Sequence, residues 1–196
     1  MNILYLHGFG SSGNSATVNL LKQYFPNDLI LSPDIPCNIK DGIAFVRQYY
    51  REHNVDLIIG TSLGGFYAMN LCGVKKVVVN PAMFPYDDLK KISEAHHDCL
   101  FDYAHRSNIL WADYDHYNNV KSIQDEFYNI VLDNELVSET YALFGDEDDV
   151  VRHEEDFKKK FNPNKCFSFK GGHRLNEELV ANTLVPLVQK VVNNEI

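Results

Sequence analysis

The sequence predicts an α/β fold, in which a mostly parallel, doubly wound sheet of about six strands carries helices on both faces. Short apolar runs alternate with longer amphipathic ones along the 196 residues. Most apolar runs are followed by a helical pattern, and parallel neighbours require such crossover connections. Serine, aspartate and histidine follow directly on the ends of three strands, at the edge where open α/β sheets bind ligands. These three observations together predict the fold class.

Six short apolar runs predict the strands of this sheet, at residues 2–8, 28–34, 55–60, 75–80, 140–146 and 165–171. Between and after them, apolar residues recur at three- and four-residue spacing, which is typical of helices packed on a core. The helical segments are residues 15–25, 40–53, 64–72, 153–161 and 176–192. A hydrophobic content of 45% is enough to bury a substantial core. We therefore expect one domain over residues 1–196.

Residues 85–139 interrupt the alternation, because they are too long for a simple crossover between the fourth and fifth strands. They hold 12 acidic residues against 4 basic ones, and eight aromatic residues that include the only tryptophan, Trp111. One interpretation is a helical insertion whose acidic face is solvated and whose aromatic residues pack. The other is a lid over a pocket beneath it. Both interpretations stay open at this point.

The composition excludes several other classes of protein. The net charge is −9, but outside residues 85–139 the chain holds 15 acidic residues against 14 basic ones. Nothing resembles the basic stripe of a nucleic-acid-binding protein, so we expect no nucleic-acid partner. The four cysteines form no C-x-x-C pair, which predicts neither a metal site nor a redox motif. The first residues resemble neither a signal peptide nor a membrane span, so we expect a cytoplasmic protein.

The stretch Gly60-Thr61-Ser62-Leu63-Gly64 has the form G-x-S-x-G and stands directly between a predicted strand and a predicted helix. A serine at such a place is often only a helix cap or a turn residue. In this strand-to-helix context, however, the pattern is typical of a nucleophile elbow, in which a strained backbone lifts the hydroxyl clear of the sheet. We therefore interpret Ser62 as a catalytic nucleophile.

A serine hydroxyl needs a base to take its proton and an acid to orient that base. His173 follows a Gly-Gly turn after the sixth strand, and the acidic run 146–149 follows the fifth strand. His173 could instead be a surface histidine, and the acidic run could be a solvated cap. The order serine, acid, histidine favours a triad. We choose Asp148 as its acid, because it stands three residues beyond Gly145, far enough along the loop to reach the histidine. Asp146 remains the alternative.

Two backbone amides are candidates for an oxyanion hole. Leu63 follows the serine at the N-terminus of the predicted helix, and Phe9 lies in the His7-Gly8-Phe9-Gly10 loop after the first strand. Amides at these two places can donate together to a developing oxyanion. We expect His7 itself to hold the loop rather than to act in catalysis.

Several motifs together resemble the YqiA/YcfP-type bacterial esterases of the α/β-hydrolase superfamily. They are LYLHGFGSS at 4–12, GTSLGGFYA at 60–68, VVVNPAMFP at 77–85, the GDEDDVV loop and the GGH turn. The resemblance implies a small serine esterase in which Ser62, Asp148 and His173 occupy the triad positions.

The sequence thus predicts an enzyme that cleaves small-molecule carboxylic esters or thioesters through an acyl-enzyme on Ser62. Such a reaction requires no metal and no organic cofactor. The alternative is a catalytically silent α/β-hydrolase-fold protein that binds a ligand or a partner, because a fold does not by itself imply activity.

Overall fold

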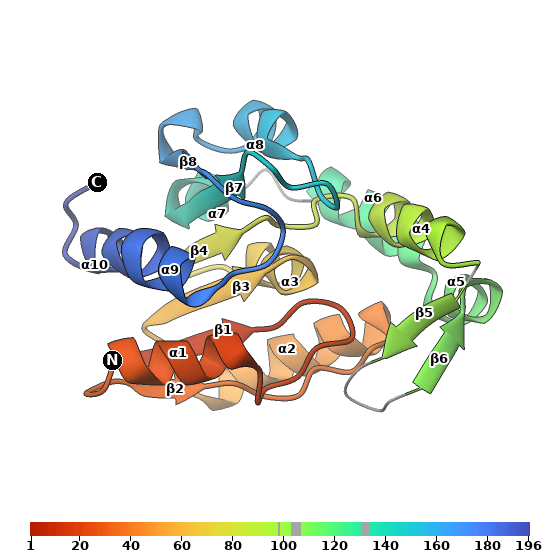
Figure 1. The fold of residues 1–196 in the computed structure, drawn as a ribbon, viewed down its shortest axis with the longest axis horizontal. Coiled ribbons are helices and arrows are strands. Elements are labelled where there is room, and N and C mark those ends of the chain that lie inside the picture. Colours follow the sequence, from red (N-terminus) through yellow and green to blue (C-terminus); the bar gives the residue numbers. More distant parts are fainter. Residues whose placement is uncertain (98, 103–106, 131–133) are drawn as a thin grey trace.

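A six-stranded parallel sheet forms the centre of the protein in the computed structural model, which describes residues 1–97, 99–102, 107–130 and 134–196 (Figure 1). The spatial order of its strands is β2-β1-β3-β4-β7-β8. Their bounds are β1 (Asn2–Leu6), β2 (Leu29–Leu31), β3 (Leu57–Thr61), β4 (Lys75–Val79), β7 (Thr140–Gly145) and β8 (Cys166–Phe169). The expected sheet of six parallel strands is confirmed.

Helices cover both faces of this sheet. One face carries α1 (Ala16–Tyr24) and the C-terminal helical run, and the other carries α2 (Ile39–Glu52), α3 (Leu63–Met69) and α8 (Glu154–Lys160). The C-terminal run consists of α9 (Glu177–Leu179), the π-helical segment η2 (Val180–Leu184) and α10 (Val185–Val192). A short 3₁₀ turn, η1 (Pro163–Lys165), precedes β8. Because successive strand residues face opposite sides, Leu4 and Leu6 enter one core cluster while Ile3 and Tyr5 enter the other.

The strand order reverses between β1 and β3. From β1 the chain crosses to β2 on one side, and from β2 it returns to β3 on the other side of β1. The segments that leave the carboxyl ends of β1 and β3 therefore diverge, and open α/β sheets bind ligands at such a switch point. Ser62 directly follows β3, and the loop of Phe9 follows β1, so both lie at this point.

The insertion at residues 85–139 contains a hairpin as well as helices. Its elements are α4 (Pro85–Ala95), β5 (Cys99–Asp102), β6 (Ser107–Leu110), α5 (Trp111–Asn118), α6 (Val120–Ile130) and α7 (Asn134–Glu139). The sequence predicted only helices, whereas β5 and β6 pair in antiparallel fashion; four-residue strands are too short for periodicity to distinguish from helical turns. Residues 98, 103–106 and 131–133 lie outside the described part. Figure 1 places α4, α5, α6 and the hairpin beyond the carboxyl ends of the strands.

Aromatic side chains join the insertion to the rest of the domain. The ring of Tyr114 meets that of Phe9 edge-on, with 5.7 Å between centroids, and Phe127 meets Phe66 in the same way at 4.9 Å. Tyr114 and Phe127 are both 3% exposed. These rings therefore pack against the loop after β1 and the helix after Ser62, as expected for aromatic residues at helical spacing.

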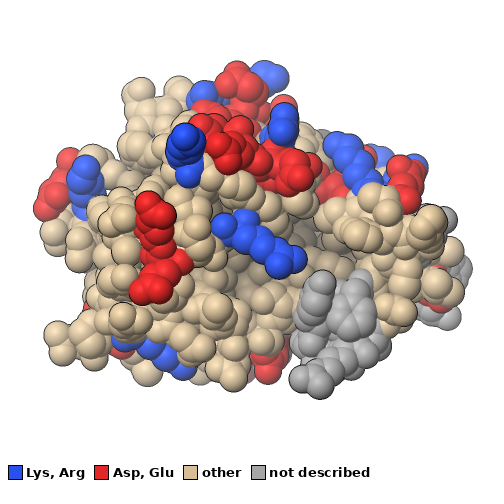
Figure 2. Space-filling view, in the orientation of Figure 1, with Lys and Arg blue, Asp and Glu red and all other residues tan. Residues whose placement is uncertain are grey.

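Charged side chains of both signs mix on the surface shown in Figure 2, where they gather along the rim over α8. In that helix Lys158 pairs with Glu154 at 2.8 Å and with Glu155 at 3.1 Å. Exposed pairs of this kind contribute little to stability. Across the described residues, no helix combines the length and the apolar character needed to cross a membrane.

Helix α3 lies so close to β1 that only glycine fits at the contact. A Cβ atom on Gly64 would lie 2.0 Å from the carbonyl oxygen of Leu6 and 2.7 Å from that of His7. All seven residues of α3 are buried. The close approach brings the segment after β1 beside the start of α3, which positions Ser62.

We predict that Gly64→Ala lowers the free energy of unfolding by about 1–3 kcal/mol or more, because the added methyl group overlaps backbone that cannot move away freely. Urea unfolding of the variant and the wild type measures the difference. Gly172→Ala is the matched control, since the nearest atom to its added Cβ is 3.6 Å away, and it should unfold like the wild type. Equal stability of Gly64→Ala and the wild type would contradict the packing described for α3.

Candidate active site

Ser62 sits in a strained turn between β3 and α3. Its φ and ψ angles are 52° and −120°, a backbone conformation that non-glycine residues rarely adopt. Hydrogen bonds on both sides hold it there: its amide donates to the Val79 carbonyl at 3.0 Å, and its carbonyl accepts from the Ala82 amide at 3.0 Å. A nucleophile elbow requires a strained turn of this kind between a strand and a helix, and the role of Ser62 as a nucleophile stays a prediction.

His173 lies between Ser62 and Asp148. Its Nε2 atom is 3.1 Å from Ser62 Oγ, and its Nδ1 atom is 2.8 Å from Asp148 Oδ2. A carboxylate can only accept a hydrogen bond, so Nδ1 carries the proton and Nε2 offers its lone pair to the serine hydroxyl. The structure therefore brings together the three residues that the sequence singled out, in the arrangement of a nucleophile, a base and an acid.

Asp148 is almost completely buried, with 1% of its surface exposed. Burial raises the pKa of its carboxyl group, but hydrogen bonds from His173 and from the Val151 and Val150 amides outweigh burial and lower the pKa below its usual value. The two amides donate to Oδ1 at 3.0 and 2.8 Å, which leaves Oδ2 for the imidazole. Asp148 thus stays ionised while it holds the histidine.

Asp146 has a different place. Its Oδ1 atom accepts a hydrogen bond from the Gly171 amide at 2.9 Å, and its own amide donates to the Phe169 carbonyl at 3.0 Å. The Glu147 amide also donates to the Gly171 carbonyl at 2.9 Å. Asp146 therefore links the loop after β7 to the Gly-Gly turn, while Asp148 is the aspartate that contacts the imidazole.

The loop after β1 runs beside Ser62. A Cβ atom on Gly8 would lie 3.2 Å from Ser62 Cβ and 3.8 Å from its Oγ. Next to it, the Phe9 amide and the Leu63 amide donate no hydrogen bond to the backbone of any residue described. Both amides thus remain candidates for an oxyanion hole, a role that stays a prediction.

The side chain of His7 stabilises the loop after β1 through two hydrogen bonds. Its Nε2 atom accepts a hydrogen bond from the Ile35 amide at 2.9 Å, and its Nδ1 atom donates to the Gly8 carbonyl at 2.8 Å. Because an amide can only donate and a carbonyl can only accept, these contacts require a neutral ring with its proton on Nδ1. The side chain is 4% exposed, which agrees with a role in holding the loop.

Two features near the site were not found from the sequence. Asn80, which follows β4, contacts the loops of both Asp148 and His173 through its side chain. A buried hydrogen bond joins His153 Nε2 to Asp88 Oδ1 at 2.9 Å, and so connects α8 to α4 of the insertion. The place of Asn80 directly after a strand could have indicated a residue near the site. The contact of His153 with Asp88 had no such signal, because the two residues are 65 positions apart in the sequence.

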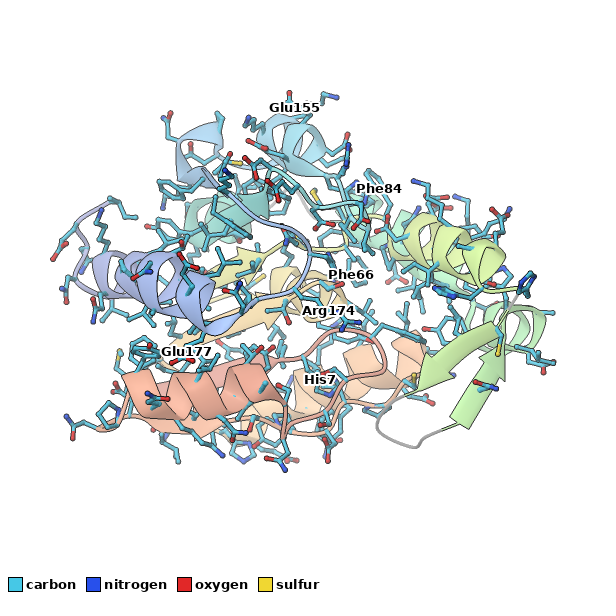
Figure 3. All side chains as sticks on the ribbon, in the orientation of Figure 1. His7, Phe66, Phe84, Glu155, Arg174 and Glu177 are labelled. Atoms are coloured by element: carbon cyan, nitrogen blue, oxygen red, sulfur yellow. The ribbon has the colours of Figure 1, made fainter. Side chains whose placement is uncertain are left out.

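Figure 3 gives the position of the site on the molecule. Arg174, which follows His173, lies near the centre of this face, between His7 and Phe66 in the view, while Phe84 lies toward the insertion. The side chain of His173 is 19% exposed, so its imidazole is reachable from the surface. Over the described part of the chain, no group of three or more His, Cys, Asp or Glu residues could hold a metal ion.

Solved structures similar to this one are α/β hydrolases. They include mouse alpha/beta hydrolase domain-containing protein 10, which is 11% identical with a TM-score of 0.66 over 100% of this chain and 90% of the other. The monoacylglycerol lipase of Paleococcus ferrophilus is 14% identical, with a TM-score of 0.63 over 98% and 94% of the two chains. Est1E of Butyrivibrio proteoclasticus is 15% identical, with a TM-score of 0.62 over 98% and 88%. At these identities the likeness establishes the α/β-hydrolase fold.

Relatives in sequence include the UPF0227 protein YcfP of Salmonella arizonae and of Salmonella newport. Each is 34% identical over an alignment of 98 residues, which covers 45% of this chain and 54% of the relative. The matched part therefore spans about half the length of these curated relatives. The model of the uncharacterised protein family UPF0227 matches residues 2–159. The family resemblance of the sequence motifs is thus confirmed, and the chain belongs to UPF0227.

Proposed function

We propose that the protein is a serine hydrolase that cleaves carboxylic esters or thioesters of small molecules through an acyl-enzyme on Ser62. The observation that carries the proposal is the chain of hydrogen bonds from Asp148 through His173 to Ser62, at 2.8 and 3.1 Å. The lipase and esterase among the similar structures support the same class of reaction.

In the first half of the reaction, Ser62 Oγ attacks the carbonyl carbon of the substrate while His173 Nε2 takes the hydroxyl proton. The carbonyl π electrons move onto oxygen, and the amides of Phe9 and Leu63 stabilise the resulting oxyanion. The oxyanion then collapses, the bond to the alcohol or thiol breaks, and His173 gives its proton to the leaving group. In the second half, water attacks the acyl carbon while His173 Nε2 takes a proton from it. The bond between the acyl carbon and Ser62 Oγ then breaks, His173 returns the proton to Oγ, and the acid is released.

Asp148 and the insertion have supporting roles in this proposal. The Asp148 carboxylate keeps the proton of the neutral imidazole on Nδ1 and stabilises the imidazolium that forms during attack. The insertion at residues 85–139 would act as a lid that borders the substrate, because its aromatic rings pack on Phe9 and Phe66 beside the elbow. A lid of this kind limits the access of bulk solvent to the bound substrate, while the one water that hydrolyses the acyl-enzyme still enters.

The first test of the proposal is covalent labelling of Ser62 with a fluorophosphonate probe. The adduct should map to the peptide that contains Ser62, and both labelling and hydrolysis of p-nitrophenyl acetate should be lost in Ser62→Ala. Ser168→Ala is the control, because Ser168 is an exposed serine that contacts Glu154 on the surface. A label on another serine, or full activity of Ser62→Ala, would show that the proposed nucleophile is wrong.

The two aspartates should differ in their effects. Asp148→Asn should lower kcat by about 10⁴-fold while the protein still folds, because an amide at this place favours the wrong tautomer of the histidine. Asp146→Asn keeps an oxygen that can accept from Gly171, so it should retain most of the activity. Steady-state kinetics and melting curves of both variants make the comparison. A large loss of kcat in Asp146→Asn alone would transfer the role of the acid to Asp146.

The lowered pKa of Asp148 predicts a pH dependence of stability. The folded protein holds this carboxylate ionised more strongly than the unfolded chain does, so the stabilisation is complete above the unfolded value of about 3.9 and is lost as the pH falls through the lowered pKa. Between pH 6 and pH 3 the wild type should therefore lose more free energy of unfolding than Asp148→Asn. Urea unfolding of both proteins across this range measures the difference, and parallel pH curves would contradict the assignment.

A further inference from the structure

Asn80 directly follows β4, which lies between the strand that leads to Ser62 and the strand that leads to Asp148. Its side chain is 1% exposed. Its φ angle is 43°, in the left-handed region that asparagine tolerates better than most residues. The carboxamide is therefore buried at the centre of the sheet edge from which the candidate triad projects.

The two ends of this carboxamide contact two different loops. Oδ1 accepts a hydrogen bond from the Gly145 amide at 2.7 Å, at the start of the loop that carries Asp148. Nδ2 donates to the carbonyl oxygens of Gly172 and His173 at 3.2 and 3.3 Å. One planar carboxamide thus links the loop that carries Asp148 to the backbone of His173. A buried amide with its oxygen and nitrogen both hydrogen-bonded holds a fixed orientation.

The contacts to Gly172 and His173 are not duplicated by the other ties between the two loops. The other hydrogen bonds, from Asp146 and Glu147, are made with Phe169 and Gly171. Among the residues described, the hydrogen bonds to the carbonyls of Gly172 and His173 come from Asn80. The position of the backbone at Gly172 and His173 therefore depends on the Asn80 side chain.

The backbone around Asn80 also holds the nucleophile. The Val79 carbonyl, one residue before it, accepts from the Ser62 amide, and the Ala82 amide, two residues after it, donates to the Ser62 carbonyl. The Asn80 amide itself donates to the Leu143 carbonyl of β7 at 2.8 Å. A shift at Asn80 would consequently change the position of His173 relative to both Ser62 and Asp148.

From this geometry we infer that Asn80 is a positioning residue, whose carboxamide sets His173 at hydrogen-bonding distance from Ser62 and Asp148. The inference rests on the proposed function. Asn80 acts through His173 and has no contact with the substrate in this role. Displacing a catalytic group by about 1 Å lowers the rate by about 10²-fold, and this sets the size of the expected effect.

The variant to test is Asn80→Gly, because glycine keeps the positive φ without strain and removes the side chain that carries the carboxamide. With p-nitrophenyl acetate as substrate, kcat should fall by about 10²-fold while KM changes little. The rate of fluorophosphonate labelling should fall in parallel. Asn194→Gly is the matched control, since Asn194 has a φ of 57° and its side chain contacts Lys75 at the other end of the molecule; its kcat should equal that of the wild type.

A double-mutant cycle with His173→Gln separates positioning from a general loss of structure. If Asn80 acts through His173, Asn80→Gly should cause no further loss of rate once His173 is replaced, because the group that it positions is absent. Losses that multiply in the double variant would overturn the inference, as would wild-type kcat in Asn80→Gly. Melting curves of all variants check that they are folded under the assay conditions.

The outcome for the proposed function is read separately from His173→Gln and Ser62→Ala alone. If either single variant retains the full rate, the proposed function fails irrespective of Asn80. If both lose activity while Asn80→Gly does not, the proposed function stands and the inference about Asn80 is wrong.

Discussion

The hydrogen bonds at the carboxyl end of β4 are the interaction on which the rest of the site depends. Within four residues of backbone, from Val79 to Ala82, this segment binds Ser62 on both sides and contacts the strand end at Gly145. The strained conformation of Ser62 persists only because these contacts hold it there. A parallel sheet supplies such a segment naturally, because its central strands end side by side at the same edge.

The different roles of Asp146 and Asp148 follow from their positions at the same carboxyl edge of the sheet. The loop from Gly145 first turns against the Gly-Gly segment, where the Asp146 carboxylate accepts from Gly171. Two residues later the chain has moved far enough for Asp148 to face the imidazole, and the Val150 and Val151 amides then occupy the second oxygen of its carboxylate. One acidic run therefore contains one residue that shapes the loop and another that holds the imidazole of His173.

The strands, most helices and the candidate triad could be predicted from the sequence because local patterns determine them. Apolar runs and helical spacing identified the sheet, and parallel topology then implied that Ser62, Asp148 and His173 meet at one edge. The contacts of Asn80 could not be predicted, because Gly145 and His173 are 65 and 93 residues away. The same reason applies to the pair of His153 and Asp88, and the hairpin β5–β6 is too short to have a clear period.

The buried pair of His153 and Asp88 connects the insertion to the α8 side of the domain. His153 begins α8 five residues after Asp148, and Asp88 lies in the first turns of α4, where the insertion starts. The ring of His153 also meets that of Phe84 edge-on, at 5.0 Å between centroids. Removing one partner of a buried hydrogen bond leaves the other unsatisfied, which is costly, so these contacts fix this end of the insertion to the start of α8. Any movement of the insertion over the site must therefore occur at residues beyond α4.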